Sequence, residues 1–358
     1  MLKKYIKIFL LNLIILIFCV EILSFILTKV NIIPNGLPPN ITLNAHEKFS
    51  YWHPKNSEFK IATKCWESKV KFNNIGIKSN KDITINKTKR RIAIIGDSMT
   101  ENKQLGNDED FASILQKLLP EYDIINFSVS SVGLADQINI YNRLIKKFSV
   151  DYLFMYVTFN DFSDNHYLHQ RPNRVAFKID DGIIKEINID KSNFFKFYNS
   201  KWNSFKRNYL IYIKKYTYSF KTYYYLKWEF NTYSHKIKKK NKSSIETNKI
   251  FNERYIIYEY LVKKANKEIF TQVPTLVFLN PDNNNFINNT KEIRAIKKIY
   301  KDYNFFDPKP DFIAYLKDKD ILKKPYLGYT CDGHYSFLGA ELMAKYTLNK
   351  FIESKNNY

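Results

Sequence analysis

A serine that follows a short apolar run is the residue of this chain best placed to do chemistry. The run Ile92-Ala93-Ile94-Ile95 ends abruptly in Gly96-Asp97-Ser98. A buried strand that delivers a serine at its carboxyl end is a common way to present a nucleophile at the rim of an α/β sheet. Because a serine hydroxyl is a weak nucleophile until a base takes its proton, Ser98 needs a histidine and a carboxylate from elsewhere in the chain.

The segment Asp332-Gly333-His334, near the other end of the chain, holds both groups. His334 is the candidate base, and Asp332 can accept a hydrogen bond from its other ring nitrogen and so fix the tautomer. Gly333 permits the backbone turn between them. Taken alone, each of the two short motifs is more often an ordinary turn or a surface histidine, so the prediction depends on their occurring together.

An acyl-transfer site also needs hydrogen-bond donors where negative charge develops on the substrate oxygen. Three candidates fall at successive predicted strand ends: the amide of Ser98, a backbone amide after the second strand, and the side-chain amide of Asn160. The alternative for Asn160 is an Asx turn that ends its strand. The coincidence of nucleophile, loop and asparagine at successive strand ends favours the oxyanion role.

Strands and helices alternate regularly from Arg90 onward. This pattern predicts right-handed βαβ units and a parallel sheet, with the site at the carboxyl ends of the strands. The predicted strands cover residues 91–95, 123–127, 151–158 and 273–280, and the predicted helices cover residues 108–119, 134–148, 251–269, 289–301 and 336–353.

An insertion at about residues 163–250 interrupts the alternation. It starts with a predicted hairpin from Arg174 to Ile189 that turns at Asp180-Asp181-Gly182. A segment crowded with lysines and aromatic residues follows, and the aromatic residues recur at near-helical spacing between Trp202 and Trp228. This spacing predicts a helix that docks on the catalytic domain, and the alternative is a surface that stacks on carbohydrate or lies at a membrane interface.

The first thirty residues predict a membrane anchor. Lys3, Lys4 and Lys7 precede an apolar stretch from Ile8 to about Val30, which is long enough for a spanning helix and longer than a typical signal-peptide core. The lysines place the amino terminus in the cytoplasm and the rest of the chain outside, in a bacterium the periplasm or outer face of the cell membrane. Glu21 is costly within this stretch, and it marks either a helix partner or a side chain that snorkels to the outer surface.

The predicted organisation is therefore a cytoplasmic tip and anchor over residues 1–30, a linker and lead-in segment over 31–89, and a catalytic domain over 90–354. Cys65 and Cys331 then lie in an oxidising compartment, where a disulfide between them is permitted. The alternative is two unpaired, partly buried thiols.

The composition weighs against nucleic acid, metals and phosphate cofactors. The net charge is +22, but the basic residues are dispersed and only Lys236 to Lys242 forms a dense run, which is typical of a solvated face. The histidines His46, His53, His166, His169 and His235 lack partners at metal-ligand spacing, and the chain has no glycine-rich phosphate loop. We expect no cofactor and no metal, and attraction to anionic glycans or lipid headgroups in preference to nucleic acid.

Four blocks in this order resemble the SGNH (GDSL-type) hydrolase family, over residues 90–160 and 270–352. The blocks are Gly96-Asp97-Ser98-Met99-Thr100, Asn126-Phe127-Ser128-Val129-Ser130-Ser131-Val132-Gly133, Thr158-Phe159-Asn160-Asp161 and Asp332-Gly333-His334. The anchor followed by Phe72-Asn73-Asn74-Ile75-Gly76-Ile77-Lys78 is similar to membrane-anchored members of bacterial envelopes. The resemblance implies a three-layer α/β/α fold with a mostly parallel central sheet.

The resemblance also implies roles for single residues. Ser98 would be the nucleophile, His334 the base and Asp332 its orienting carboxylate, with Asn160 and the amides of Ser98 and Ser131 as oxyanion donors. The chain departs from the family where Ser131 stands in place of glycine, so that Gly133 is an alternative donor.

Thr158 also replaces a usual glycine. The implied function is that of an envelope-anchored esterase or O-acyltransferase acting on acyl, most simply acetyl, esters of a surface or exported glycan. A transferase would further need a periplasmic donor or a membrane partner that delivers the acyl group. The alternative is a degenerate SGNH-like domain that binds glycans or acts as an assembly scaffold.

Overall fold

The computed structural model describes residues 2–37, 39–169, 174–187, 200, 205, 209, 213, 216–238, 244–281, 290–319, 327–329 and 333–356. Its centre is a five-stranded sheet in the order β11-β10-β7-β5-β6, in which every neighbouring pair is parallel. The strands are β5 (Arg90–Ile95), β6 (Tyr122–Asn126), β7 (Tyr152–Val157), β10 (Thr275–Leu279) and β11 (Phe305–Phe306). The predicted parallel sheet is confirmed.

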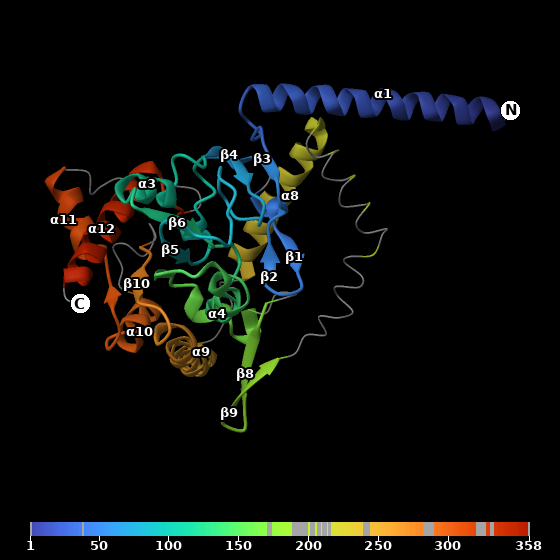
Figure 1. The fold of residues 1–358 in the computed structure, drawn as a ribbon. Helices are drawn as coiled ribbons and strands as arrows, with labels where there is room; N and C mark the ends of the chain where they lie inside the picture. The colour runs from blue at the N-terminus through green and yellow to red at the C-terminus, as the bar shows by residue number, and fades with distance from the viewer. Residues whose placement is uncertain are drawn as a thin grey trace.

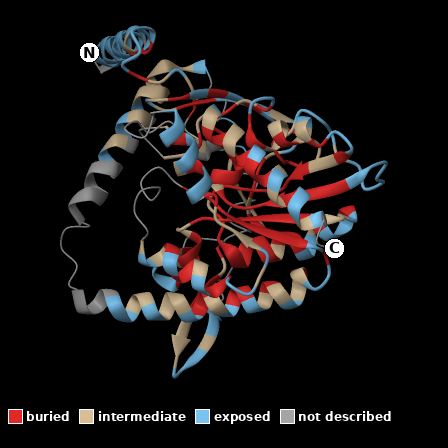
Figure 2. Ribbon diagram, turned by 90° about the vertical axis from the view of Figure 1, so that its left-hand side faces the viewer, coloured by how far each residue is buried: buried red, intermediate tan, exposed pale blue. Residues whose placement is uncertain are grey.

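Helices cover both faces of this sheet (Figure 1), and alternate residues of β5 show why. Ile92 and Ile94 are fully buried on the face covered by α3 (Phe111–Leu118), α11 (Lys309–Asp318) and α12 (Phe337–Asn356). Ala93 and Ile95 are buried on the face covered by α4 (Leu134–Arg143), α9 (Ser244–Ala265) and α10 (Lys291–Ile299). A strand that is apolar on both faces reads as a continuous hydrophobic run, which is the pattern of residues 92–95. The predicted three-layer α/β/α fold is confirmed (Figure 2).

The remaining short elements connect these layers. The structure has the helices α2 (Ser98–Glu101) and α5 (Asp161–Asp164), the 3₁₀ turns η1 (Pro39–Thr42), η2 (Ile145–Phe148) and η3 (Tyr167–His169), and a π-helical turn η5 (Asn266–Phe270). The α11 helix follows Pro308 and was not predicted.

The segment between the predicted anchor and the sheet is folded, although the sequence analysis assigned residues 31–89 to a linker and lead-in segment. It forms two antiparallel pairs, β1 (Asn44–His46) with β2 (Ser50–Trp52) and β3 (Ser57–Ala62) with β4 (Glu67–Phe72). On β4 the residues alternate between exposed and buried, and Val70 and Phe72 are fully buried. The buried face of β4 packs in a cluster with Leu37, Ile61 and Trp66 of the same segment, whereas Phe49 and Trp52 join the core beside the central sheet.

The insertion begins with the predicted hairpin. Strands β8 (Ala176–Asp180) and β9 (Ile183–Ile187) pair in antiparallel fashion around Asp181 and Gly182, which both have positive φ. Helix α8 (Tyr218–Lys238) follows and runs from α1 (Leu2–Lys29) down one side of the molecule (Figure 1). The basic run at 236–242 lies largely outside the described residues. Helix α1 is long and apolar enough to cross a membrane.

Candidate active site

The nucleophile turn is built by a glycine that has no room for a side chain. A Cβ on Gly96 would lie 2.4 Å from the Thr100 hydroxyl oxygen and 3.1 Å from Cβ of Tyr156. The chain can therefore turn tightly at the end of β5 and begin α2 at Ser98. The Asp97 carboxylate accepts the Met99 N–H at 3.0 Å and caps this short helix.

Ser98 and His334 meet although they are more than two hundred residues apart. His334 Nε2 lies 2.9 Å from Ser98 Oγ, which is hydrogen-bond distance for a base and its nucleophile. The histidine loop is held by its backbone, since Tyr329 N–H donates to the His334 carbonyl at 2.8 Å and Ser336 N–H donates to the Leu327 carbonyl at 3.0 Å. Gly333 has φ +77°, the left-handed conformation that glycine adopts without strain. Asp332 lies outside the described residues.

Asp97 is a fully buried carboxylate directly beside the nucleophile. It accepts hydrogen bonds from Thr158 Oγ1 at 3.0 Å and from Asn160 Nδ2 at 3.2 Å, besides the Met99 amide. Burial raises the pKa of Asp97, although these hydrogen bonds and the nearby His334 ring oppose the rise. Thr158, which stands where the resembling family has glycine, is thus tied into the site through its hydroxyl.

The Asn160 side chain points back to two carboxylates. Its Nδ2 donates to Asp164 Oδ2 at 2.9 Å as well as to Asp97. Its side chain makes no capping hydrogen bond to α5, so the Asx-turn alternative does not describe this residue. Both N–H groups of its amide have acceptors in this arrangement. A substrate oxyanion must therefore compete with one of the two carboxylates for a hydrogen bond from this amide.

The loop after β6 contains the two alternative oxyanion amides. Ser131 has φ +67°, a conformation that a non-glycine residue adopts at some cost. The Gly133 N–H donates to Asp136 Oδ2 at 3.1 Å and so already has an acceptor.

Two buried charged residues that sequence reasoning missed hold this loop from both sides. Glu101 accepts the N–H of Ser130 at 2.6 Å and also the Ser130 hydroxyl. Arg174 donates from Nε to the Ser131 carbonyl at 3.0 Å. Glu101 is only three residues beyond Ser98, but Arg174 lies in the insertion, where the sequence offers no spacing that would point to the site.

Glu101 is also the centre of a buried charge cluster that reaches the lead-in segment. Its Oε1 lies 2.6 Å from His53 Nε2, and its Oε2 lies 3.5 Å from Lys103 Nζ. Burial alone would raise the pKa of Glu101, but Lys103 and His53 outweigh it and hold this pKa far below its usual range. His53 Nδ1 contacts the Thr42 carbonyl at 2.8 Å. The segment between α1 and the sheet therefore touches a residue that holds the candidate oxyanion loop.

The predicted disulfide has one partner in the described part of the chain. Cys65 is half-buried beside Trp66, whose ring contacts the ring of Tyr329 at 6.4 Å between centroids. Tyr329 precedes the histidine loop, so this loop and the Cys65 region are neighbours. Cys331 lies outside the described residues, and the bond stays a prediction. Within the described residues, no group of three or more His, Cys, Asp or Glu side chains is arranged to hold a metal ion.

Of the comparisons with known proteins, only the comparison of structures finds matches to this chain. No model of a protein family and no curated protein matches the chain. An acetyl xylan esterase, AlAXEase, is 12% identical with a TM-score of 0.37, over 72% of this chain and 98% of its own. A two-domain esterase (CEX) active on acetylated mannans is 13% identical with a TM-score of 0.37, over 75% of this chain and 50% of its own.

A member of the lipolytic protein G-D-S-L family from Veillonella parvula is 11% identical with a TM-score of 0.37, over 73% of this chain and 97% of its own. In the chain itself, the serine follows β5, the candidate oxyanion loop follows β6, Asn160 follows β7, and the histidine precedes the last helix. This order of blocks along a parallel sheet resembles that of the SGNH hydrolases.

Proposed function

We propose that this chain is an envelope-anchored serine esterase or O-acyltransferase that acts on acetyl or other short acyl esters of a glycan. The observation that carries the proposal is the 2.9 Å contact between Ser98 Oγ and His334 Nε2 at the carboxyl end of the sheet. A serine paired with a histidine in this way is the diagnostic arrangement of an activated nucleophile.

The proposed mechanism uses two half-reactions. His334 removes the Ser98 proton as the oxygen attacks the acyl carbonyl, and Asp332 is the proposed carboxylate that orients the ring. The amides of Ser98 and Ser131 and the Asn160 side chain stabilise the oxyanion. His334 then protonates the leaving sugar oxygen, and an acyl-Ser98 ester remains. Water or a second sugar hydroxyl, deprotonated by His334, attacks this ester and releases the serine.

Helix α1 is the proposed anchor, and its contacts favour retention over cleavage. Glu21 accepts the backbone N–H groups of Tyr218 and Ser219 at 2.5 and 3.0 Å, and the Phe25 ring meets the Tyr218 ring edge-on at 5.0 Å. A helix partner for Glu21 is thus present in α8. A signal sequence that is removed would leave these amides and this ring without their contacts.

The function is tested on the full-length protein in detergent or nanodiscs. We expect a fluorophosphonate probe to label Ser98, located by peptide mass analysis, and we expect acetate release from acetylated xylo- or manno-oligosaccharides. Labelling without acetate release would support an activated serine and contradict these acyl glycans as substrates. The absence of labelling would support the scaffold alternative. Mass analysis of envelope glycans from cells that lack Ser98 gives the direction: acetyl groups lost mean transfer, and acetyl groups gained mean hydrolysis.

Asn160→Ala is expected to lower kcat by about 10²- to 10³-fold with little change in KM, because an oxyanion donor acts mainly in the transition state. Asn142→Ala is the matched control, since Asn142 lies on the exposed face of α4 and its side-chain amide donates to Glu268 of η5. Steady-state hydrolysis of a chromogenic acetyl ester provides both constants. A rise in KM of about the same factor, with kcat unchanged, would contradict the oxyanion role.

A further inference from the structure

Helix α8 carries an apolar stripe that the rest of the described structure does not cover. Tyr223, Leu226 and Phe230 recur at a spacing of three and four residues, so they lie on one face, and they are 54%, 58% and 70% exposed. The exposed Lys227 lies beside them, with its Nζ 5.9 Å from the centre of the Tyr223 ring. We refer to Tyr223, Leu226 and Phe230 as the α8 stripe.

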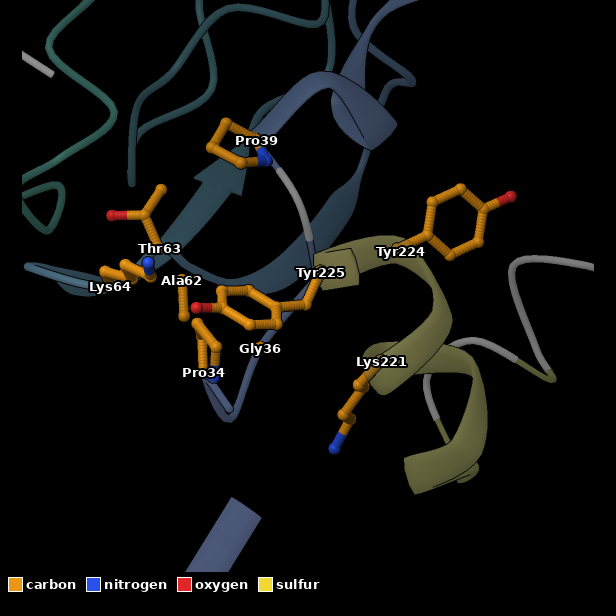
Figure 3. Close-up of a pocket in the computed structure, with 9 residues that line it drawn as sticks. All are labelled: Pro34, Gly36, Pro39, Ala62, Thr63, Lys64, Lys221, Tyr224 and Tyr225. Carbon is orange, nitrogen blue, oxygen red and sulfur yellow. The ribbon is translucent and has the colours of Figure 1, made fainter. Parts of the chain in front are cut away.

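The other side of α8 is attached to the protein. Lys64 Nζ pairs with Glu229 Oε1 at 2.5 Å and lies 5.4 Å from the centre of the Tyr225 ring. Figure 3 shows Tyr225 turned toward Pro34 and Ala62 across a small cavity, whereas Tyr224 points away from them. These contacts fix the rotation of α8 about its axis, and the stripe faces outward because of them.

The contact with Glu21 sets the position of α8 along the anchor. Glu21 lies about 12 Å before the end of α1 at 1.5 Å per residue, and an apolar helix needs about 30 Å to cross the hydrocarbon layer. The first turn of α8 is bonded to Glu21, so α8 begins beside the outer part of the predicted span, within about 12 Å of the end of α1. Tyrosine, phenylalanine and lysine are residue types typical of the outer membrane–water boundary, where rings lie at headgroup depth and lysines reach the lipid phosphates.

We propose that the α8 stripe lies on the outer surface of the same lipid bilayer that α1 crosses. The occupant of this face is lipid, because the stripe continues from the anchor and its neighbouring lysine complements anionic headgroups. Together, α1 and α8 fix the orientation of the catalytic domain on the membrane, which a single flexible stalk cannot do. The inference rests on the proposed function only in its use of α1 as an anchor.

The test is site-directed spin labelling of full-length protein in nanodiscs that contain anionic phospholipid. Leu226→Cys and, as a matched control, Ile352→Cys are labelled in a Cys19→Ser background; Ile352 is a 48% exposed aliphatic residue on α12. We expect the collision ratio of oxygen to a water-soluble nickel complex to be higher at position 226 than at 352. Labelling at Phe230→Cys checks the same face if Leu226→Cys fails to fold.

Three results would overturn the inference. Equal water access at 226 and 352 would leave the stripe in solvent. A label at 226 that neither oxygen nor nickel reaches would mean that protein covers it, and a label shielded only after acetylated oligosaccharide is added would make it a glycan surface. Protein that does not remain with the lipid would instead contradict the anchor, so the two failures are distinguishable.

A second inference concerns Arg174, which is 2% exposed. Besides its bond to the Ser131 carbonyl, its Nη1 lies 2.8 Å from Asp164 Oδ1, and Asp164 Oδ2 accepts the Asn160 amide. One guanidinium group thus contacts both proposed sources of oxyanion donors, the loop at Ser131 and, through Asp164, the Asn160 side chain. We infer that Arg174 is a positioning residue for the oxyanion site, which rests on the proposed function.

Arg174→Ala is expected to lower kcat by about 10²-fold with KM little changed, because displacing catalytic groups by about 1 Å costs this much. Added guanidinium ion at millimolar concentration should restore part of the rate in this variant and leave the wild type unchanged. Arg174→Lys keeps the charge but cannot form both contacts, so it should fold and remain slow. A change in KM alone, or full activity of Arg174→Lys, would contradict the positioning role; loss of Ser98 labelling in the wild type would instead contradict the proposed function.

Discussion

Ser98→Ala is expected to lower kcat for a chromogenic acetyl ester by about 10⁴- to 10⁶-fold, the loss typical of removing a catalytic serine. The variant keeps the fold, because Ser98 is partly exposed and the adjoining Asp97 cap bonds to the Met99 backbone instead of to the serine hydroxyl. Steady-state kinetics and the thermal midpoint measure the two effects separately. Ser354→Ala, whose hydroxyl bonds to a carbonyl within α12, is the control and should retain full activity.

The partner of Ser98 gives a second check on the same unit. His334→Ala should cost nearly as much as Ser98→Ala, and the double variant should cost no more than either alone, because the two groups act together in one step. Additive losses would mean that serine and histidine act independently, and a Ser98→Ala enzyme with undiminished acetyl release would reject the assignment.

Glu101→Ala is expected to lower the free energy of unfolding by about 3–5 kcal/mol, the cost of removing one partner from a buried ion pair. The loss is large because Lys103 and His53 are both buried, and their polar groups would lose the carboxylate that pairs with them. Glu341→Ala is the matched control: Glu341 pairs with Lys345 on the surface of α12, where such a pair contributes about 0.3–0.5 kcal/mol. Unfolding followed by fluorescence measures both.

Acidification should reduce this contribution in a defined direction. Since the pKa of Glu101 is lowered in the folded state, its stabilising effect is fully present above the ordinary glutamate pKa of 4.5 and is lost as the pH falls further below it. The difference in stability between wild type and Glu101→Gln should therefore narrow below about pH 4.5. A difference that stays constant down to pH 3 would contradict the role of the charge. Because Glu101 also binds the Ser130 amide, we expect kcat to fall in Glu101→Gln as well.

The sequence was sufficient for four of the five strands of the sheet and for the pairing of Ser98 with His334. The apolar runs of β5, β6, β7 and β10 are local signals, and the glycine before Asp97 and Ser98 marks the tight turn after β5. The order of serine, asparagine and histidine blocks predicted which residues meet, and the structure places Ser98 against His334. The sequence did not predict the strands between Asn44 and Phe72, because they are short and are stabilised only by packing in the folded chain.

Tertiary structure alone decided how the candidate oxyanion loop and helix α8 are held. Arg174 reaches the loop from the insertion, and His53 of the lead-in segment reaches Glu101, which binds the loop. No periodicity or spacing records a contact between segments so far apart. The sequence left Glu21 with two interpretations, and the backbone amides of α8 provide a partner for its carboxylate. Local patterns determine which elements form, because propensity and periodicity are local. The partners of buried charges depend on which segments come together, because burying a charge is favourable only with its partners in place.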